Sequence, residues 1–424
     1  MPKIDPKKAT FPPSVQATSG QSCTNFSQHC RIQISIIIGP LRSCGKPCTH
    51  DKSPRMELEL IVRRMLAVAA VLTFSAAGAG MAQAAPEVTQ VSVGGFTTLE
   101  SSQSAKSLLE FWTPERLQRA AENPMPAPIV NLEAAKRAHE KAQKNQKKAQ
   151  GRGPLTANAV APAHKNAVTA SPLTTNAAIA DLSRSDLASP LGWQVNITGR
   201  LFFSTGSGGY SSCTASAIVS NNKNSIWTAG HCMHGGKNGG FYSNFVFAPG
   251  YDETAPWGFW PLRRGIVSSA WADDSDFLWG DVAGGIVAAP EVEYGNLQDW
   301  TGAFGYRFNG DADIDDVTSL GYPADGYNRT SADLHEGAKP MYCHGNAVDA
   351  GNWNPLDNRL KLACDMGGGA SGGPMIINFG VNSQIVGTNS HRLADNNNQW
   401  VENYLYSSNH GGNAAGVINW LNAN

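Results

Sequence analysis

The sequence has 424 residues, with 33 Lys and Arg, 34 Asp and Glu and a formal net charge of −1. A hydrophobic content of 41% and a charged content of 16% are typical of an ordinary globular protein, and the length allows two or three domains. The charge is unevenly spread, because residues 190–424 hold 11 Lys and Arg against 21 Asp and Glu. This acidic balance argues against nucleic-acid binding, since phosphates would be repelled.

Residues 1–55 are not expected to form a domain. They are polar and interrupted by proline, so we interpret them as an over-extended translation start. They hold four cysteines and a histidine that could bind zinc or form two disulfides, although no paired C-x-x-C is present: Cys23, Cys30, Cys44, Cys48 and His50. No metal site is predicted here.

Residues 56–84 have the layout of a secretory signal peptide. Arg63 and Arg64 precede an apolar run over residues 65–74, and small residues follow up to Ala84. The apolar run is too short for a membrane-spanning helix. The sequence therefore predicts a secreted protein that has no membrane segment after signal cleavage.

Residues 85–189 are predicted to be helical and flexible. An amphipathic helix is expected over Ser107–Ala121, near the helix-starting pair Thr113-Pro114, and a basic helix over 131–148. Residues 151–180 are rich in Ala, Pro, Asn and Thr, which is typical of a linker. The region holds one of the 11 tryptophans, so a large core is not expected. A disordered spacer remains the alternative.

Residues 190–424 are predicted to be all-β. Short apolar runs separated by turn residues indicate a barrel or a sandwich. The expected strands are 199–204, 215–220, 224–228, 244–248, 281–287, 315–321, 384–388 and 400–406. One short helix is expected at the C-terminal end, over 414–422.

Two motifs in this region indicate nucleophilic catalysis. Five glycines surround Ser371 in the stretch 364–374, which indicates unusual backbone angles or close approach to a ligand. The backbone N–H groups of Gly369 and Ser371 are placed to form an oxyanion hole. His231 follows an apolar strand and a small-residue turn, and a histidine is the usual base that activates a serine hydroxyl.

The motif T-A-G-H-C at 228–232, followed by G-x-S-G-G-P at 369–374, resembles the chymotrypsin-like serine endopeptidases. More narrowly, it resembles the secreted bacterial trypsin-like and glutamyl-endopeptidase-like enzymes, over roughly residues 190–424. The resemblance implies two packed six-stranded β-barrels with the active site between them. It also implies that residues 85–189 are a pro-segment and linker, removed on maturation. From the opposite charges, the lysine-rich stretch 136–148 is expected to dock on the acidic protease domain before cleavage, so the pro-segment is a candidate inhibitor within the same chain.

The third member of the implied Ser-His-Asp triad is expected between His231 and Ser371 in chain order. Asp281 opens an apolar run and resembles the family's aspartate in sequence and spacing. Three acids just upstream are the alternative, as a more solvated cluster: Asp273, Asp274 and Asp276. Gly284 and Gly285 depart from the bulkier residues that usually follow the family's aspartate.

Four cysteines lie in the predicted protease domain. A hairpin around residues 221–224 would bring Cys213 and Cys232 together, and Cys343 and Cys364 can close the segment before Ser371. Export to an oxidising compartment favours disulfides over a metal site. The pairs 213–232 and 343–364 match the arrangement that the resemblance implies.

Substrate recognition is expected to involve residues near the two ends of the nucleophile loop. Asp365 lies where trypsin-like enzymes hold the aspartate that recognises basic side chains, although it could be structural. The stretch after the nucleophile walls the specificity pocket in the family: Thr388, Asn389, Ser390 and His391. His391 is a candidate for glutamate recognition, whereas His234 is expected on a loop surface. The sequence does not predict which residue the enzyme prefers immediately before the cleaved bond.

The predicted function is therefore a secreted serine endopeptidase made as a pro-enzyme. We expect protein or peptide substrates, a monomer, and no cofactor or metal. The competing hypothesis is a catalytically inactive binding protein on the same scaffold. An esterase is disfavoured, because esterases usually carry a G-x-S-x-G serine in an α/β fold with the histidine after the serine.

Overall fold

The structure is a computed structural model that describes residues 88–131, 155–163, 186–187, 193–206, 208–290, 295–350, 359–380 and 382–424. All of them belong to one compact unit, Ala82–Asn424. The expected start at 1–55, the signal peptide, nearly all of the basic helix and most of the linker lie outside these residues. No helix within the described ranges is long and apolar enough to cross a membrane.

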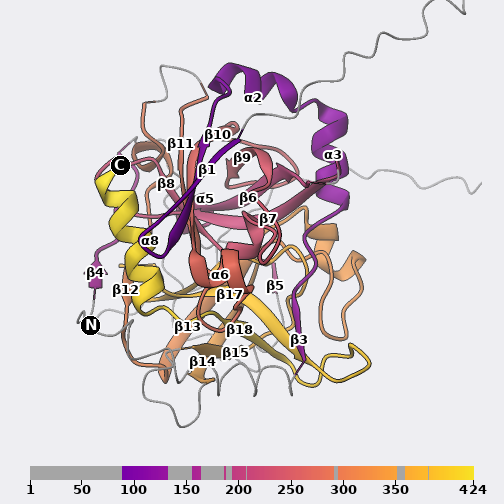
Figure 1. Cartoon of the computed structure of the whole chain (residues 1–424). Helices are drawn as coiled ribbons and strands as arrows, with labels where there is room; N and C mark the ends of the chain where they lie inside the picture. The colour runs from indigo at the N-terminus through magenta and orange to yellow at the C-terminus, as the bar shows by residue number, and fades with distance from the viewer. Residues whose placement is uncertain are drawn as a thin grey trace, which may run out of the picture. The chain divides into compact units, whose positions relative to one another are not determined.

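The first of two closed barrels is formed by six antiparallel strands. The strands follow the order β10-β11-β8-β7-β6-β9, and pairing of β9 with β10 closes the barrel (Figure 1). They are β6 (Thr198–Ser204), β7 (Tyr210–Ala217), β8 (Ser225–Thr228), β9 (Ser243–Pro249), β10 (Trp260–Ser268) and β11 (Ala283–Val287). Its interior is filled by large apolar side chains, among them Phe203, Trp227 and Trp260, all fully buried.

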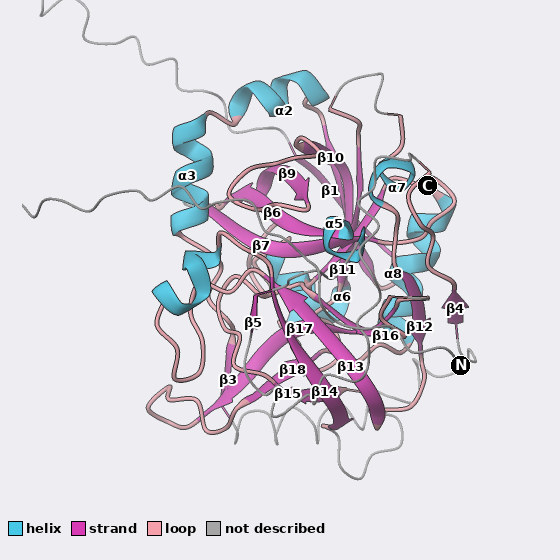
Figure 2. Cartoon of the chain, turned by 180° about the vertical axis from the view of Figure 1, so that it is seen from behind, coloured by secondary structure: helices cyan, strands magenta, loops and turns pink. Residues whose placement is uncertain are grey.

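The second barrel is closed in the same way. Its order is β16-β13-β14-β15-β18-β17, and β16 pairs with β17 to complete the ring. The strands are β13 (Ile314–Gly321), β14 (Met341–Asp349), β15 (Leu360–Ala363), β16 (Pro374–Ile377), β17 (Gln384–Ala394) and β18 (Tyr404–Ser407). Seen from behind, the first barrel lies above the second (Figure 2). The predicted all-β fold with two six-stranded barrels is confirmed.

Short elements connect and cover the barrels. The added strands are β4 (Leu155–Ala157), β5 (Asp186–Leu187) and β12 (Gly305–Phe308), which extend the second sheet. The short helices are α5 (Trp193–Ile197), η2 (Gly230–Cys232), α6 (Ser269–Asp274), α7 (Leu297–Thr301) and η4 (Ala332–Gly337). The expected C-terminal helix is α8 (Gly412–Ala423), so its presence is confirmed.

The glycines at the start of β11 are explained by close packing on both faces of the strand. A Cβ atom on Gly284 would lie 2.7 Å from Cδ1 of Leu421, and one on Gly285 would lie 2.3 Å from Cδ1 of Leu262. Larger residues would push the helix off the barrel on one face and disrupt the core on the other. The small residue at 284 therefore accommodates α8, and the one at 285 accommodates Leu262 of the barrel core.

Residues 88–131 differ from the prediction of a helical and flexible region. They begin with a β-hairpin, β1 (Val88–Val93) and β2 (Phe96–Ser101), whose second strand pairs with β10 of the first barrel. Leu99 points into the barrel core. A stretch with few apolar residues forms strands here because the edge of β10 supplies partners for its backbone N–H and C=O groups.

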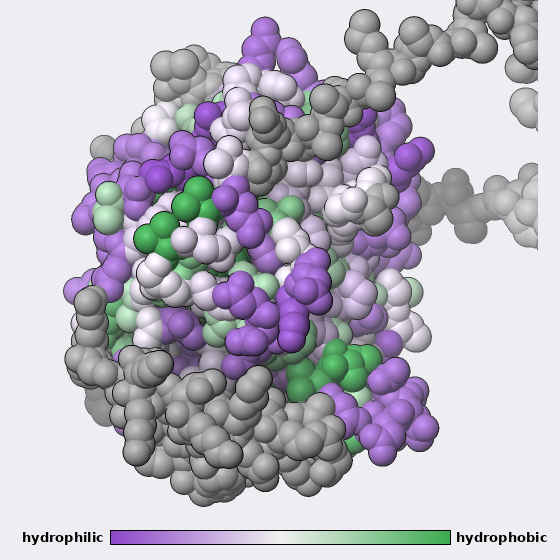
Figure 3. Space-filling model, in the orientation of Figure 1, coloured by the Kyte–Doolittle hydropathy of each residue, from purple (hydrophilic) through white to green (hydrophobic). Residues whose placement is uncertain are grey.

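The single helix expected over Ser107–Ala121 is in fact two helices. These are α2 (Ala105–Phe111) and α3 (Pro114–Glu122), and the chain then forms the short strand β3 (Ile129–Asn131). The break falls at Trp112 and Thr113, because Pro114 disfavours a helical conformation of the residue before it. The hydroxyl of Thr113 instead accepts a hydrogen bond from the N–H of Arg116 and caps α3. Along its outer edge, α3 presents hydrophilic side chains to solvent (Figure 3).

Candidate active site

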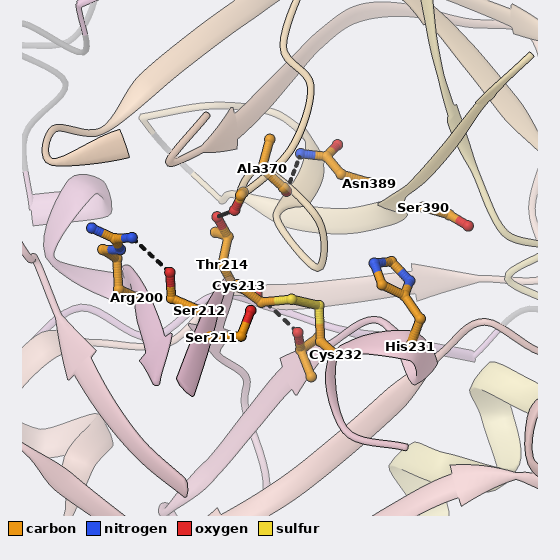
Figure 4. Close-up of a disulfide and its surroundings, with 12 residues drawn as sticks. Arg200, Ser211, Ser212, Cys213, Thr214, His231, Cys232, Ala370, Asn389 and Ser390 are labelled. Carbon is orange, nitrogen blue, oxygen red and sulfur yellow. Dashed lines mark hydrogen bonds between the residues drawn. A yellow bond between two sulfur atoms is a disulfide. The ribbon is translucent and has the colours of Figure 1, made fainter. Parts of the chain in front are cut away.

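His231 lies on the tight turn η2 that ends β8. The neighbouring Cys232 forms a disulfide with Cys213 on β7, with an S–S distance of 2.00 Å (Figure 4). The turn is thus bonded covalently to the adjacent strand of its own barrel. A turn constrained in this way holds the imidazole in one position before any substrate binds.

Asp281 orients the imidazole of His231. Its carboxylate accepts the backbone N–H of His231 at 2.8 Å, and Nδ1 of the ring lies 2.9 Å from Oδ2 and 3.1 Å from Oδ1. Because a carboxylate can only accept hydrogen bonds, the ring proton belongs on Nδ1. Nε2 is then an acceptor; it is buried and has no hydrogen-bond partner among the described residues. This tautomer is the one that a general base requires.

The upstream acids have other environments. Oδ1 of Asp276 accepts hydrogen bonds from the backbone N–H groups of Leu278 and Trp279, and burial raises the pKa of its carboxyl. Asp273 and Asp274 are exposed at the end of α6. Among the predicted candidates, Asp281 is the residue that contacts His231.

The hydroxyl of Ser390 also contacts the Asp281 carboxylate. The Oγ–H of Ser390 on β17 donates to Oδ2 of Asp281 at 2.5 Å, and Asp281 itself is fully buried. Figure 4 shows Ser390 beside His231, approaching from the second barrel. The pair from the first barrel is thus held by a group from the second barrel. The sequence placed Ser390 among the substrate-binding residues and gave no signal of this contact.

Ser371 lies on the glycine-rich turn between β15 and β16. Gly369 has a φ of +88° and Gly372 a φ of +82°, a region of backbone conformation that side chains disfavour. A Cβ atom on Gly372 would also lie 2.1 Å from Oγ1 of Thr228. Both glycines are therefore required for the backbone path that carries Ser371.

Thr214 ties this nucleophile loop to the first barrel. Its backbone N–H donates to the carbonyl of Ser371 at 2.8 Å, and its hydroxyl donates to the carbonyl of Gly369 at 2.8 Å. Because Thr214 follows Cys213 directly, the disulfide, the histidine turn and the serine loop form one connected unit. The tertiary structure thus brings His231 into contact with Asp281, and it joins the loop of Ser371 to the first barrel through Thr214.

The residues predicted to bind substrate are buried. Asp365 forms an ion pair with Arg329, with 2.7 Å between Nη1 and Oδ2. The Oγ1 atom of Thr388 accepts from Nε1 of Trp227 and lies 2.8 Å from Nε2 of His410.

The side chain of Asn389 is also fully engaged within the protein. Its amide bonds the hydroxyl of Ser319 and the carbonyls of Leu320 and Ala370. These contacts hold β17 against the nucleophile loop.

His391 is buried next to Ser390. Its Nδ1 lies 2.9 Å from Oγ of Ser390, and its ring stacks on Tyr406 with 5.3 Å between centroids. Burial lowers the pKa of His391 to about 3. The proposed role of His391 in glutamate recognition stays a prediction.

His234 corrects a prediction, because it is fully buried instead of lying on a loop surface. Its Nδ1 accepts the backbone N–H of Gly236 at 3.0 Å, and its ring meets Phe241 edge to face. Burial lowers the pKa of its imidazole. The turn after His231 is folded inward because Nε1 of Trp271 donates to the carbonyl of His234.

The second disulfide joins Cys343 to Cys364, with an S–S distance of 2.11 Å. Both disulfides have the pairing that the sequence resemblance implies. Among the residues that the structure describes, two groups of side chains have the spacing of metal ligands, but all four cysteines in them are disulfide-bonded and offer no thiolate: Cys213 with His231 and Cys232, and Cys343 with Cys364 and Asp365. The disulfides indicate folding in an oxidising compartment.

Comparison with known proteins gives structural matches only. No family model matches the sequence, and no curated protein matches it. Among solved structures, the protease Anisep from Arthrobacter nicotinovorans is 27% identical, covers 55% of this chain and 97% of its own, and has a TM-score of 0.46. A thermostable serine protease, AL20, from an extremophilic microorganism is 28% identical over 55% of this chain and 99% of its own, with a TM-score of 0.47. A Glu endopeptidase is 19% identical over 57% of this chain and 97% of its own, with a TM-score of 0.43.

The two closed six-stranded barrels determine the assignment of the fold. The chain resembles the chymotrypsin-like serine proteases. Within this chymotrypsin-like fold, the first barrel carries His231 and Asp281, and the second carries Ser371 and Ser390. The fold alone does not fix an activity, so the function is argued from these residues.

Proposed function

We propose that the chain is a secreted serine endopeptidase, made as a pro-enzyme, that cleaves peptide bonds in proteins or peptides. The observation that carries the proposal is the hydrogen bonding of Nδ1 of His231 to Asp281, which leaves Nε2 as a lone-pair acceptor. A serine hydroxyl needs such a base to become nucleophilic. Ser371 is the proposed nucleophile.

In the proposed mechanism, Nε2 of His231 accepts the proton of Ser371 as its Oγ attacks the peptide carbonyl. The N–H groups of Gly369 and Ser371 stabilise the oxyanion, and Asp281 stabilises the imidazolium. His231 then protonates the leaving amine. Water, deprotonated by His231, hydrolyses the acyl-enzyme and restores the serine. These steps require no cofactor.

The pro-enzyme state is supported by the packing of residues 88–131 on the barrels. In this segment Trp112 is buried against Phe202 and Tyr210, and its Nε1 donates to the carbonyl of Asn244 at 2.6 Å. Export through the signal peptide at 56–84 agrees with the two disulfides. Docking of the basic helix at 136–148 on the acidic protease domain stays a prediction.

The candidate true starts after the over-extended region are Met56 and Met65. The test compares the chain expressed from Met65 with the same chain carrying Ser371→Ala. We expect the wild type to be trimmed and to cleave a mixed peptide library, and the variant to do neither. The cleaved sites would also reveal the preferred residue before the scissile bond. If both proteins fold with two disulfides but neither cleaves peptides or reacts with a fluorophosphonate, the inactive binding protein becomes the better interpretation.

A further inference from the structure

Residues 123–131 form a strap that is bound by both barrels. Their short strand β3 runs parallel to β17, with Ile129 opposite Arg392. In Figure 1 the chain descends from α3 beside the first barrel to β3 at the second. The hydrogen bonds that attach the strap include those of Ser211 Oγ to the carbonyl of Asn123 at 2.8 Å, Met125 N–H to the carbonyl of Ser212 at 2.8 Å, Gly369 N–H to the carbonyl of Met125 at 2.9 Å, and Arg392 N–H to the carbonyl of Pro128 at 3.1 Å.

The contact with Gly369 bears directly on catalysis. The N–H of Gly369 is a proposed oxyanion donor, and it already donates to the Met125 carbonyl. A Cβ atom on the adjacent Gly368 would lie only 3.2 Å from the same oxygen, so the strap lies close against the loop. A substrate carbonyl needs the same N–H group. The strap and a substrate therefore compete for one position.

The composition of the strap favours binding without cleavage. Proline occupies every second position, at 124, 126 and 128, which restricts the backbone to extended conformations before binding. Little conformational entropy is then lost on docking. The bond that follows the Met125 carbonyl leads to the nitrogen of Pro126, whose ring carbon replaces the N–H of an ordinary peptide. Expelling this nitrogen would require His231 to protonate a crowded tertiary amide nitrogen.

The elements that precede the strap in the chain keep it close to the nucleophile loop. The hairpin of β1 and β2 extends the first barrel, and Trp112 anchors the junction of α2 and α3. At the end of α3, Nη2 of the buried Arg200 donates to the carbonyl of Ala121 at 3.1 Å and to Oγ of Ser212 at 2.6 Å. The strap therefore begins at a fixed point beside the nucleophile loop.

We propose that residues 123–131 are an inhibitory strap, which occupies the Gly369 oxyanion donor with the Met125 carbonyl and resists cleavage through Pro126. The inference rests on the proposed peptidase function. Cleavage beyond the strap leaves it docked, and activity appears only when the segment 88–131 dissociates or is degraded.

The test uses the full chain from Met65 with the substitutions Pro124→Gly, Pro126→Gly and Pro128→Gly, which loosen the strap. The matched control is Pro162→Gly, in the segment beside β4. Each protein is treated with a fluorophosphonate probe, and intact and trimmed forms are separated on a gel so that labelling of Ser371 is read for each. We expect the loosened intact chain to label about tenfold faster than the intact wild type, and the control to match the wild type.

If the intact wild type and the loosened chain label at equal rates and the trimmed form is also labelled, the inhibitory role of the strap is wrong. The proposed peptidase function would still stand. Absence of labelling in every form would instead reject the peptidase. A loosened chain that labels more slowly than the wild type would also contradict the inference. A lowered Tm would identify poor folding as the cause.

A second and independent inference concerns His391. Because Ser390 Oγ–H donates to Asp281, the oxygen of Ser390 is free to accept the proton on Nδ1 of His391, 2.9 Å away. His391 is thus the end of a chain of hydrogen bonds that leads through Ser390 and Asp281 to His231. Its Nε2 is buried and has no partner among the described residues, so no other hydrogen bond explains the orientation of the ring.

We further infer that His391 is a positioning residue, which fixes the Ser390 hydroxyl toward Asp281 by donating Nδ1–H to its oxygen. It does not contact the substrate in this role. The inference applies to the same proposed reaction, and it separates His391 from the glutamate-recognition role that the sequence suggested.

The test compares His391→Phe with His391→Asn. Phenylalanine keeps the ring packing against Tyr406 but has no donor, whereas the amide N–H of asparagine can take the place of Nδ1–H. We expect His391→Phe to lower kcat about tenfold with unchanged KM, and His391→Asn to retain most of kcat despite a lower Tm. A kcat that follows Tm, with the phenylalanine variant the more active, would show that the ring serves packing alone.

Discussion

At the scale of the residue, the decisive feature is the acceptor role of Asp281. Its carboxylate accepts hydrogen bonds from the backbone N–H and Nδ1–H of His231 and from the hydroxyl of Ser390. All three partners are donors, so this position requires an acceptor. An amide in its place would present an N–H group to at least one of these donors. The imidazole would then favour the tautomer with its proton on Nε2, which cannot accept a proton from Ser371.

We therefore predict that Asp281→Asn lowers kcat by about 10⁴-fold, a loss typical of this change in a Ser-His-Asp site. The measurement is the rate of peptide hydrolysis after trimming by an added protease. Asp276→Asn is the matched control, because Asp276 caps the backbone at Leu278 and Trp279, and it should keep activity within about threefold. Full activity in Asp281→Asn would assign the orienting role to another residue.

At the scale of the element, the helices α2 and α3 are attached chiefly by a small number of apolar anchors, whereas the hairpin before them pairs with β10 through β2. Trp112 is the largest of them, and its ring packs against Phe202 and Tyr210 while Nε1 is hydrogen-bonded. Much of the rest of α2 and α3 faces solvent. Docking of these two helices should thus depend strongly on one side chain.

We predict that Trp112→Ala lowers the free energy of opening of the segment by about 3 to 5 kcal/mol, through the lost packing and the cavity left behind. The measurement is amide hydrogen exchange over residues 96–122, in chains that also carry Ser371→Ala so that no self-cleavage occurs. Lys106→Ala is the control, since its side chain is 84% exposed. Unchanged exchange in Trp112→Ala would place the attachment in the hairpin instead.

At the scale of the whole molecule, buried neutral histidines make the fold sensitive to acid. Burial lowers the pKa of His391 to about 3 and that of His410 to about 4. His410 accepts the hydroxyl proton of Thr388 at Nε2 and lies with Nδ1 2.9 Å from the carbonyl of Ser408, so a second ring proton would break one contact. The unfolded chain binds these protons near pH 6.5, whereas the folded chain does not. Their contribution to stability is therefore complete above pH 6.5 and is lost as the pH falls.

We predict that the urea midpoint of the Ser371→Ala chain decreases between pH 6.5 and pH 4. Each such histidine contributes a slope of about 1.4 kcal/mol per pH unit within this window. His410→Gln, whose amide oxygen can still accept from Thr388, should reduce the slope by about one proton. A slope that does not differ between the two chains would mean that His410 is not buried as a neutral group in solution.

The sequence by itself determined the all-β class, the motifs around His231 and Ser371, the disulfide pairs and the choice of Asp281 as the residue that contacts His231. Each of these follows from local spacing or from a family pattern. It placed some strand ends incorrectly: β18 begins at Tyr404 and not at Trp400, because the preceding residues form a turn with one bridge from Ala394 to Trp400. It also missed four barrel strands, β10, β14, β15 and β16. The mixed polar and apolar residues of β10 and β14 show no clear alternation.

Only the tertiary structure decided the roles that depend on contacts across the barrels. The support of Asp281 by Ser390 joins residues 109 positions apart, and no local pattern encodes it. The burial of His234 and His391, the hairpin on β10 and the strap at Gly369 likewise depend on which surfaces meet. Local propensity sets the conformation that a segment can adopt, whereas the pairing of distant edges and side chains decides which groups are placed at the site.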